Sequence, residues 1–173
     1  MTMFSTLRAR KRDMRTLSAL MSTSLERAGR DGGRLAGAHD LLVAALELDD
    51  GTAEEVFARL GSSGSAFVAA IDEQDAEALR SLGIDEPTDA GAGTAASAGT
   101  ARPSGTDATY DAAIRNIHAV HNEGAEVRAL VGAHVVAGVA EVERGVAARA
   151  LRVMGLRPAD VVTVARAVAE EAS

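Results

Sequence analysis

The sequence contains no cysteine and no tryptophan, and it is poor in proline and in the other aromatic residues. Without cysteine the chain cannot form a disulfide bond, a thiolate metal site or a cysteine nucleophile. The aromatic residues are limited to Phe4, Phe57, Phe67 and Tyr110. A core must therefore be built from alanine, leucine, valine and methionine. No stretch alternates apolar and polar residues for long enough to predict a sheet, so we expect an all-α fold.

Long apolar runs are also missing, and lysine occurs once. No window approaches the roughly 20 apolar residues of a membrane-spanning helix, and the basic N-terminal residues precede no apolar region of a secretory signal. We therefore expect a cytoplasmic protein with no membrane partner. Lys11 has no neighbouring glycine, which excludes a Walker A nucleotide site. The net charge of −7 argues against a dedicated nucleic-acid-binding protein.

One motif occurs twice in the chain. Residues 37–61 read GAHDLLVAALELDDGTAEEVFARLG, and residues 132–155 read GAHVVAGVAEVERGVAARALRVMG. The second copy is one residue shorter between Gly-Ala-His and its internal glycine. After that glycine, apolar residues recur at the spacing of one buried helical face: Ala53, Val56, Phe57 and Leu60 in the first copy, and Ala147, Ala150, Leu151 and Met154 in the second. This pattern predicts a duplicated helical unit.

The chain divides into two such units with a linker between them. Residues 1–12 are a basic lead-in, 13–83 the first unit, 84–108 a linker rich in Gly, Ala, Ser and Thr, and 109–173 the second unit. The expected helices cover residues 13–29, about 38–48, 52–60, a stretch from Ser65, a short segment from Asp75 to Gly83, about 109–124, 133–142, 145–154 and a last stretch from Pro158. Thr52 and Glu55 are predicted to form a capping box.

The repeated segment resembles the Clp amino-terminal domain (Clp repeat, or R, domain), which precedes the ATPase rings of ClpA-, ClpC- and ClpB-type unfoldases. The family pattern is G-T-E-H-I-L-L-G-L, about five polar residues, and then G-V-A-A-x-x-L-x-x-L-G. Residues 145–155 follow its second half closely, and residues 51–61 follow it more loosely. The resemblance covers residues 13–83 and 109–171. It implies two pseudo-twofold related four-helix Clp repeats joined by a flexible linker, with a recognition function and no ATPase motor.

The chain departs from the family at the residues that the resemblance implies for ligand binding. The Thr and Glu of G-T-E-H help to bind substrates or adaptors, in some members through phosphoarginine. Here Ala38 and His39 stand in the first copy, and in the second the Glu position is Ala133 or His134, according to where the missing residue falls. Neutral histidine lacks the paired acceptors that a guanidinium prefers. The candidate ligand-binding residues are Ala38, His39, Asp40, Ala133, His134 and Tyr110, the last being the only aromatic residue near the start of the second unit.

Two functions follow from this resemblance. The first is a non-enzymatic module that binds peptides, adaptors or small cyclic peptides of the Clp proteolysis system and modulates or competes with a Clp unfoldase. The alternative is a regulatory or scaffold protein that kept the fold and lost the ligand site. We expect no catalytic residue, no cofactor and no metal, and we interpret His118 and His121 as an exposed helix surface rather than zinc ligands. His39 and His134 either line a ligand pocket or cap their helices. An open groove at these histidines favours the first function, and a closed one favours the alternative.

Overall fold

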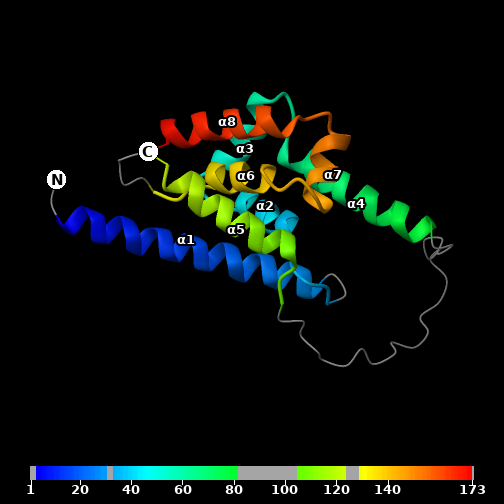
Figure 1. The fold of residues 1–173 in the computed structure, drawn as a ribbon, viewed down its shortest axis with the longest axis horizontal. Helices are drawn as coiled ribbons and strands as arrows, with labels where there is room; N and C mark the ends of the chain where they lie inside the picture. The colour runs from blue at the N-terminus through cyan, green and yellow to red at the C-terminus, as the bar shows by residue number, and fades with distance from the viewer. Residues whose placement is uncertain (1–2, 31–32, 82–104, 124–128, 173) are drawn as a thin grey trace.

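The computed structural model describes residues 3–30, 33–81, 105–123 and 129–172 (Figure 1). Within these ranges the chain forms eight helices and no strand, which confirms the all-α prediction. The helices in chain order are α1 (Met3–Arg30), α2 (Ala38–Leu46), α3 (Thr52–Arg59), α4 (Gly64–Ser81), α5 (Ala108–His121), α6 (Gly132–Ala140), α7 (Val146–Val153) and α8 (Pro158–Glu171). None of the described helices is long and apolar enough to cross a membrane.

The short helices α2 and α6 form the centre of the molecule (Figure 1). All nine residues of α6 are buried, and in α2 only Leu46 is partly exposed. The two helices are antiparallel, because a Cβ added to Gly132 at the start of α6 would lie 3.2 Å from the carbonyl oxygen of Ala45 at the end of α2. Helix α1 packs on α2, and α5 and α8 pack on α6. A helix surrounded in this way has to be apolar on every face, and the sequences of α2 and α6 are mostly apolar throughout.

The third and fourth helices of each half, α3 and α4 in the first and α7 and α8 in the second, pack against helices of the other half. Helix α3 of the first half packs on α8 of the second, and α7 of the second half packs on α4 of the first. A single cluster of buried apolar residues includes members of all eight helices, among them the tilted ring pair of Phe57 and Phe67 with centroids 5.8 Å apart. The two halves therefore share one core.

Two helix boundaries and one helix cap differ from the sequence prediction. Helix α1 begins at Met3, not near Asp13, because residues 3–12 contain good helix formers and no glycine or proline to end the helix. Helix α4 runs without a break to Ser81, so the separate short helix from Asp75 to Gly83 was wrong as far as the described residues go. The capping box was also wrong: Gly51 is the N-cap of α3, with a φ of 65°.

The predicted linker 84–108 lies outside the described residues up to residue 104. Its last residues belong to the folded body, because Ala36 and Thr106 form an isolated parallel bridge. The amide of Ala36 donates to the carbonyl of Gly105 at 3.1 Å, and the amide of Asp107 donates to the carbonyl of Ala36 at 2.9 Å. This bridge fixes the segment before α5 beside the segment before α2.

Candidate functional site

The candidate residues lie at two separate places. Ala38, His39 and Asp40 form the first turn of α2, and Ala133 and His134 belong to the first turn of α6. Because α6 starts beside the end of α2, the length of α2, about 14 Å for nine residues, separates the two places. The structure therefore does not bring His39 and His134 together.

All the candidate residues are buried. His39 is 7% exposed, His134 3%, Tyr110 2% and Asp40 not at all, and Ala38 and Ala133 are equally closed to solvent. Their positions do not form the open groove that the first predicted function needs. The site is closed, which is the condition that favours the alternative, a scaffold or regulatory protein.

At the start of α2 the carboxylate of Asp40 accepts three hydrogen bonds. Its two oxygens accept a fork from the Arg34 guanidinium at 2.6 and 2.7 Å, and Oδ2 also accepts the backbone N–H of Gly37 at 2.8 Å. Gly37 is the N-cap of the helix, so Asp40 satisfies one of the donors that a helix start leaves free. A buried carboxylate is tolerated here because a guanidinium and an amide neutralise it.

His39 lies beside this ion pair, and its burial favours the neutral form of the ring. Its Nε2 is 3.5 Å from Oδ2 of Asp40. Desolvation lowers the pKa of His39 below its usual 6.5, and the Arg34 charge acts in the same direction, while the carboxylate of Asp40 opposes both. The ring is packed against the backbone, since a Cβ added to Gly37 would lie 2.9 Å from its Nδ1. His39 is thus a packed interior side chain.

At the start of α6 the corresponding role is taken by His134. Its Nδ1 accepts the backbone N–H of Val131, the N-cap residue, at 3.2 Å, so this nitrogen carries no proton. The His134 ring packs edge-to-face on His121 of α5, with ring centroids 5.1 Å apart. Nε2 of His121 is 3.5 Å from Oδ2 of Asp13 in α1, and Oδ1 of Asp13 accepts the N–H of Leu130 at 2.9 Å. The two histidines thereby link α1, α5 and α6.

The interpretation of His118 and His121 as an exposed surface holds for His118 only. His118 is exposed, whereas His121 is partly buried between Asp13 and His134. No group of three or more His, Cys, Asp or Glu residues within the described part of the chain is arranged to hold a metal ion. Sequence reasoning missed the contact of Asp13 with His121, because the two residues are more than 100 positions apart.

The two Gly-Ala-His segments are not structurally equivalent. Val131, the N-cap of α6, lies 94 positions after Gly37, the N-cap of α2, and Gly145 lies 94 positions after Gly51. The first residues of α4 and α8, Gly64 and Pro158, have the same spacing. The histidines, however, are 95 positions apart, so His134 corresponds to Asp40, and Ala133 corresponds to His39. No residue is missing between the copies, and the recurrence of Gly-Ala-His is a shift of one position.

At each of the two helix starts, a threonine from elsewhere in the chain accepts a backbone N–H. The amide of Ala38 donates to Oγ1 of Thr109 at 3.1 Å, and the amide of Ala133 donates to Oγ1 of Thr52 at 2.8 Å. Both threonines donate their own hydroxyl proton to an aspartate two residues earlier, Asp107 at 2.6 Å and Asp50 at 2.7 Å. An Asp-x-Thr sequence thus satisfies an amide at each helix start, and this repeated spacing is visible in the sequence.

Tyr110 joins α5 to α1 in the interior. Its hydroxyl lies 3.2 Å from Oγ of Ser24, which is itself fully buried, and burial raises the pKa of the phenol above its usual 10. The tyrosine therefore acts as a packing residue with a satisfied hydroxyl and offers no face to a ligand.

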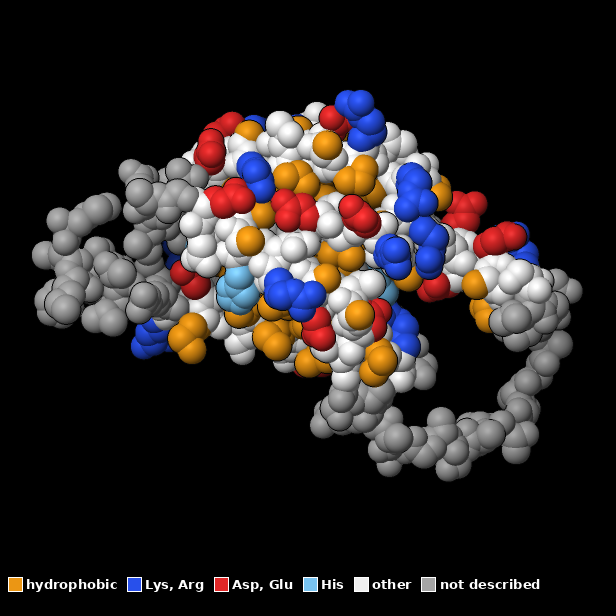
Figure 2. All heavy atoms as spheres, in the orientation of Figure 1, with side chains coloured by type: hydrophobic (Ala, Val, Ile, Leu, Met, Phe, Trp, Pro, Cys, Tyr) orange, Lys and Arg blue, Asp and Glu red, His pale blue; other side chains and the backbone are white. Residues whose placement is uncertain are grey.

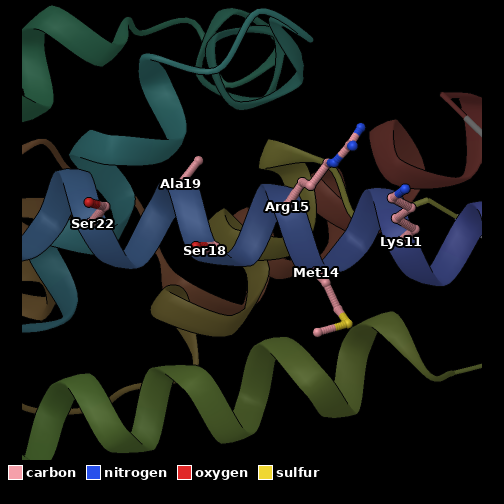
Figure 3. A pocket seen from close by; sticks show the side chains of 6 residues that line it. All are labelled: Lys11, Met14, Arg15, Ser18, Ala19 and Ser22. Atoms are coloured by element: carbon pink, nitrogen blue, oxygen red, sulfur yellow. The ribbon is translucent and has the colours of Figure 1, made fainter.

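A shallow hollow lies away from all these residues, on the outer face of α1. It is lined by side chains of that helix alone: Lys11, Met14, Arg15, Ser18, Ala19 and Ser22 (Figure 3). None of its lining residues is a candidate residue from the sequence. It is a surface feature of one helix, and it lacks the enclosing walls of a small-molecule site.

Comparison with models of protein families gives no match for this chain, and comparison with curated proteins gives none either. The resemblance to the Clp amino-terminal domain therefore rests on the repeated sequence motif alone.

Proposed function

We propose that this chain is a non-enzymatic scaffold or regulatory protein with a fold of the Clp amino-terminal type. In it, the positions of the family's ligand site are buried and hold the protein's own helices together. The observation that carries the proposal is the burial of Asp40 and His134, whose hydrogen bonds cap the two central helices. A partner would therefore bind the outer surface of the protein. We also place the protein in the cytoplasm, as the sequence predicts.

The one-position shift between the copies supports this proposal. In the family pattern the residue before the histidine is the glutamate that takes part in binding. With the observed register that position is His39 in the first half and Ala133 in the second, and neither is acidic. The acidic residue of the region, Asp40, already holds the chain's own Arg34 guanidinium. A guanidinium ligand would have to displace Arg34 from a buried position.

The outer surface carries many charged side chains that a protein partner could contact. Figure 2 shows acidic and basic side chains interspersed over the face of the molecule seen in Figure 1. Interspersed charges of this kind suit a partner with a complementary pattern better than a nucleic acid, which requires a continuous basic stripe.

A titration tests the proposal. Calorimetry with a phosphoarginine peptide and with a Clp-binding cyclic peptide is expected to show no binding, and a Clp-type unfoldase is expected to bind with unchanged affinity when His39 is replaced by Gln. Micromolar binding of either small ligand, abolished by His39→Gln or by His134→Gln, would overturn the scaffold function and restore the ligand-binding one. Absence of unfoldase binding would remove the Clp system as the source of the partner.

A further inference from the structure

The described parts of α1 and α4 include two exposed helix faces of opposite charge. On α1, Lys11, Met14 and Arg15 are exposed at the i, i+3, i+4 spacing of one helix face, with Met14 74% exposed. On α4, Asp72, Asp75 and Leu79 are exposed at the spacing of one face, with Leu79 47% exposed. Each face thus combines one large apolar side chain with two charges of the same sign.

These charges form no ion pair within the part of the chain that the structure describes. Within the described residues, Lys11, Arg15, Asp72 and Asp75 take part in no ion pair, whereas Glu77 on another face of α4 pairs with Arg80. Figure 2 shows carboxylates along the outer part of α4. Gln74 of α4 contacts Arg149 of α7, and the neighbouring Asp75 is near enough to buried His39 for its charge to act on that ring.

The two faces cannot meet within one molecule. The N-terminal half of α1 and the C-terminal end of α4 lie at opposite ends of the long axis (Figure 1). A pairing between them has to join two molecules, and because the paired surfaces differ, it is a head-to-tail contact.

We propose that this protein self-associates head to tail, with the basic face of α1 (Lys11, Met14, Arg15) on the acidic face of α4 (Asp72, Asp75, Leu79) of a second copy. Met14 and Leu79 meet at the centre, and the cations and carboxylates pair around them. Two helix faces of about two turns bury less than the roughly 1,200 Å² of a stable interface, so the association is weak and concentration-dependent. It is also sensitive to salt, since the Debye length falls to about 3 Å at 1 M.

Sedimentation equilibrium up to about 1 mM protein, the range where a contact of this size is populated, tests the proposal. We expect reversible association at low salt that is lost at 1 M salt. The isosteric variants Lys11→Gln/Arg15→Gln and Asp72→Asn/Asp75→Asn should each raise the dissociation constant about tenfold. The matched controls Arg144→Gln/Arg152→Gln and Asp49→Asn/Glu143→Gln change exposed charges elsewhere and should associate like the wild type. Circular dichroism checks that every variant is folded.

A mixing experiment identifies the head-to-tail geometry. An equimolar mixture of the α1 variant and the α4 variant contains one intact pair of faces, so we expect 1:1 heterodimers that grow no further. A wild type that stays monomeric over the whole range, or an association that only one of the two variants weakens, would overturn the proposal. Equal weakening by the control variants would do the same, because it would assign the effect to net charge.

Discussion

The starts of α2 and α6 occupy equivalent places in the two halves, and different chemistry caps them. In the first half a carboxylate, Asp40, caps the helix and is neutralised by Arg34, whereas in the second half the Nδ1 atom of an imidazole, His134, accepts the N-cap amide. Histidine and aspartate both present an acceptor at the third helical position. The comparison shows that the third residue of each helix has to supply a hydrogen-bond acceptor. Whether that acceptor is charged depends on whether a cation such as Arg34 lies beside it.

The close contact of α6 with α5 at Gly138 should give the largest difference in free energy of unfolding between equivalent substitutions in the two halves. A Cβ added to Gly138 in α6 would lie 2.6 Å from both the backbone nitrogen and Cγ1 of Ile117, whereas the equivalent position in α2 already carries the Cβ of Ala44. We expect Gly138→Ala to lower the free energy of unfolding by about 3 kcal/mol, because backbone has to move. Ala44→Gly should cost about 1 kcal/mol. Urea denaturation of both variants measures the difference, and equal effects would contradict it.

Removing the two caps should have unequal effects. Asp40→Ala leaves the Gly37 amide and the Arg34 guanidinium without their acceptor, and we expect a loss of about 2 kcal/mol, less than for a fully buried pair because the Arg34 side chain is 32% exposed. His134→Ala removes the hydrogen bond to the Val131 amide and the ring contact with His121, and it should cost about 1.5 kcal/mol. The double variant Arg34→Ala/Asp40→Asn serves as the control, since it removes both charges. A larger loss for His134→Ala would show that the ion pair contributes little.

The two threonines should contribute equally and independently. Thr52→Val and Thr109→Val each remove an acceptor from a helix start, and we expect each to cost about 1 kcal/mol. Their effects should add within about 0.5 kcal/mol in the double variant, because the two starts lie apart. Thermal denaturation by circular dichroism checks both statements. Strong non-additivity would indicate that the two helix starts are coupled through the α2–α6 contact.

The smallest expected effect is a dependence of stability on pH. The folded state lowers the pKa of His39 from 6.5, so below pH 6.5 the unfolded chain binds more protons than the folded one, and stability falls as the pH falls from there toward the folded pKa. One such group contributes at most about 1.4 kcal/mol per pH unit. His39→Gln should flatten this part of a stability–pH curve, while His118→Gln, which changes an exposed histidine, should not. An unchanged slope in His39→Gln would assign the effect elsewhere.

Several elements could be predicted because their signal is local. The glycines at 51, 61, 145 and 155 have positive φ values and delimit α3 and α7. Of the periodic apolar residues between them, six are buried as expected, whereas Leu60 and Met154 are only partly buried against the core. Pro158 stands in the first turn of α8, as its fixed φ favours. In contrast, helix α1 was predicted too short, because a polar, basic stretch without a breaker gives no sign of where a helix begins.

The candidate site residues were chosen from the resemblance to the family motif, and a ligand-binding role for them stays a prediction. The motif marked residues 38–40 and 133–134, which the structure places at the starts of α2 and α6. It could not show that Arg34, Thr109 and Thr52 would satisfy them from the same loop and from distant segments. It also matched histidine to histidine, where the helix starts match histidine to aspartate.

The sequence by itself determined the helical class, the duplicated unit and the two apolar central helices, because these depend on the composition and on the spacing of neighbouring residues. Tertiary structure alone decided the rest. It set the register of the two halves, since only the helix starts show which residues are equivalent. It also decided how the buried backbone amides at those starts are satisfied, because their side-chain acceptors lie up to 82 positions away and a buried donor has to find an acceptor.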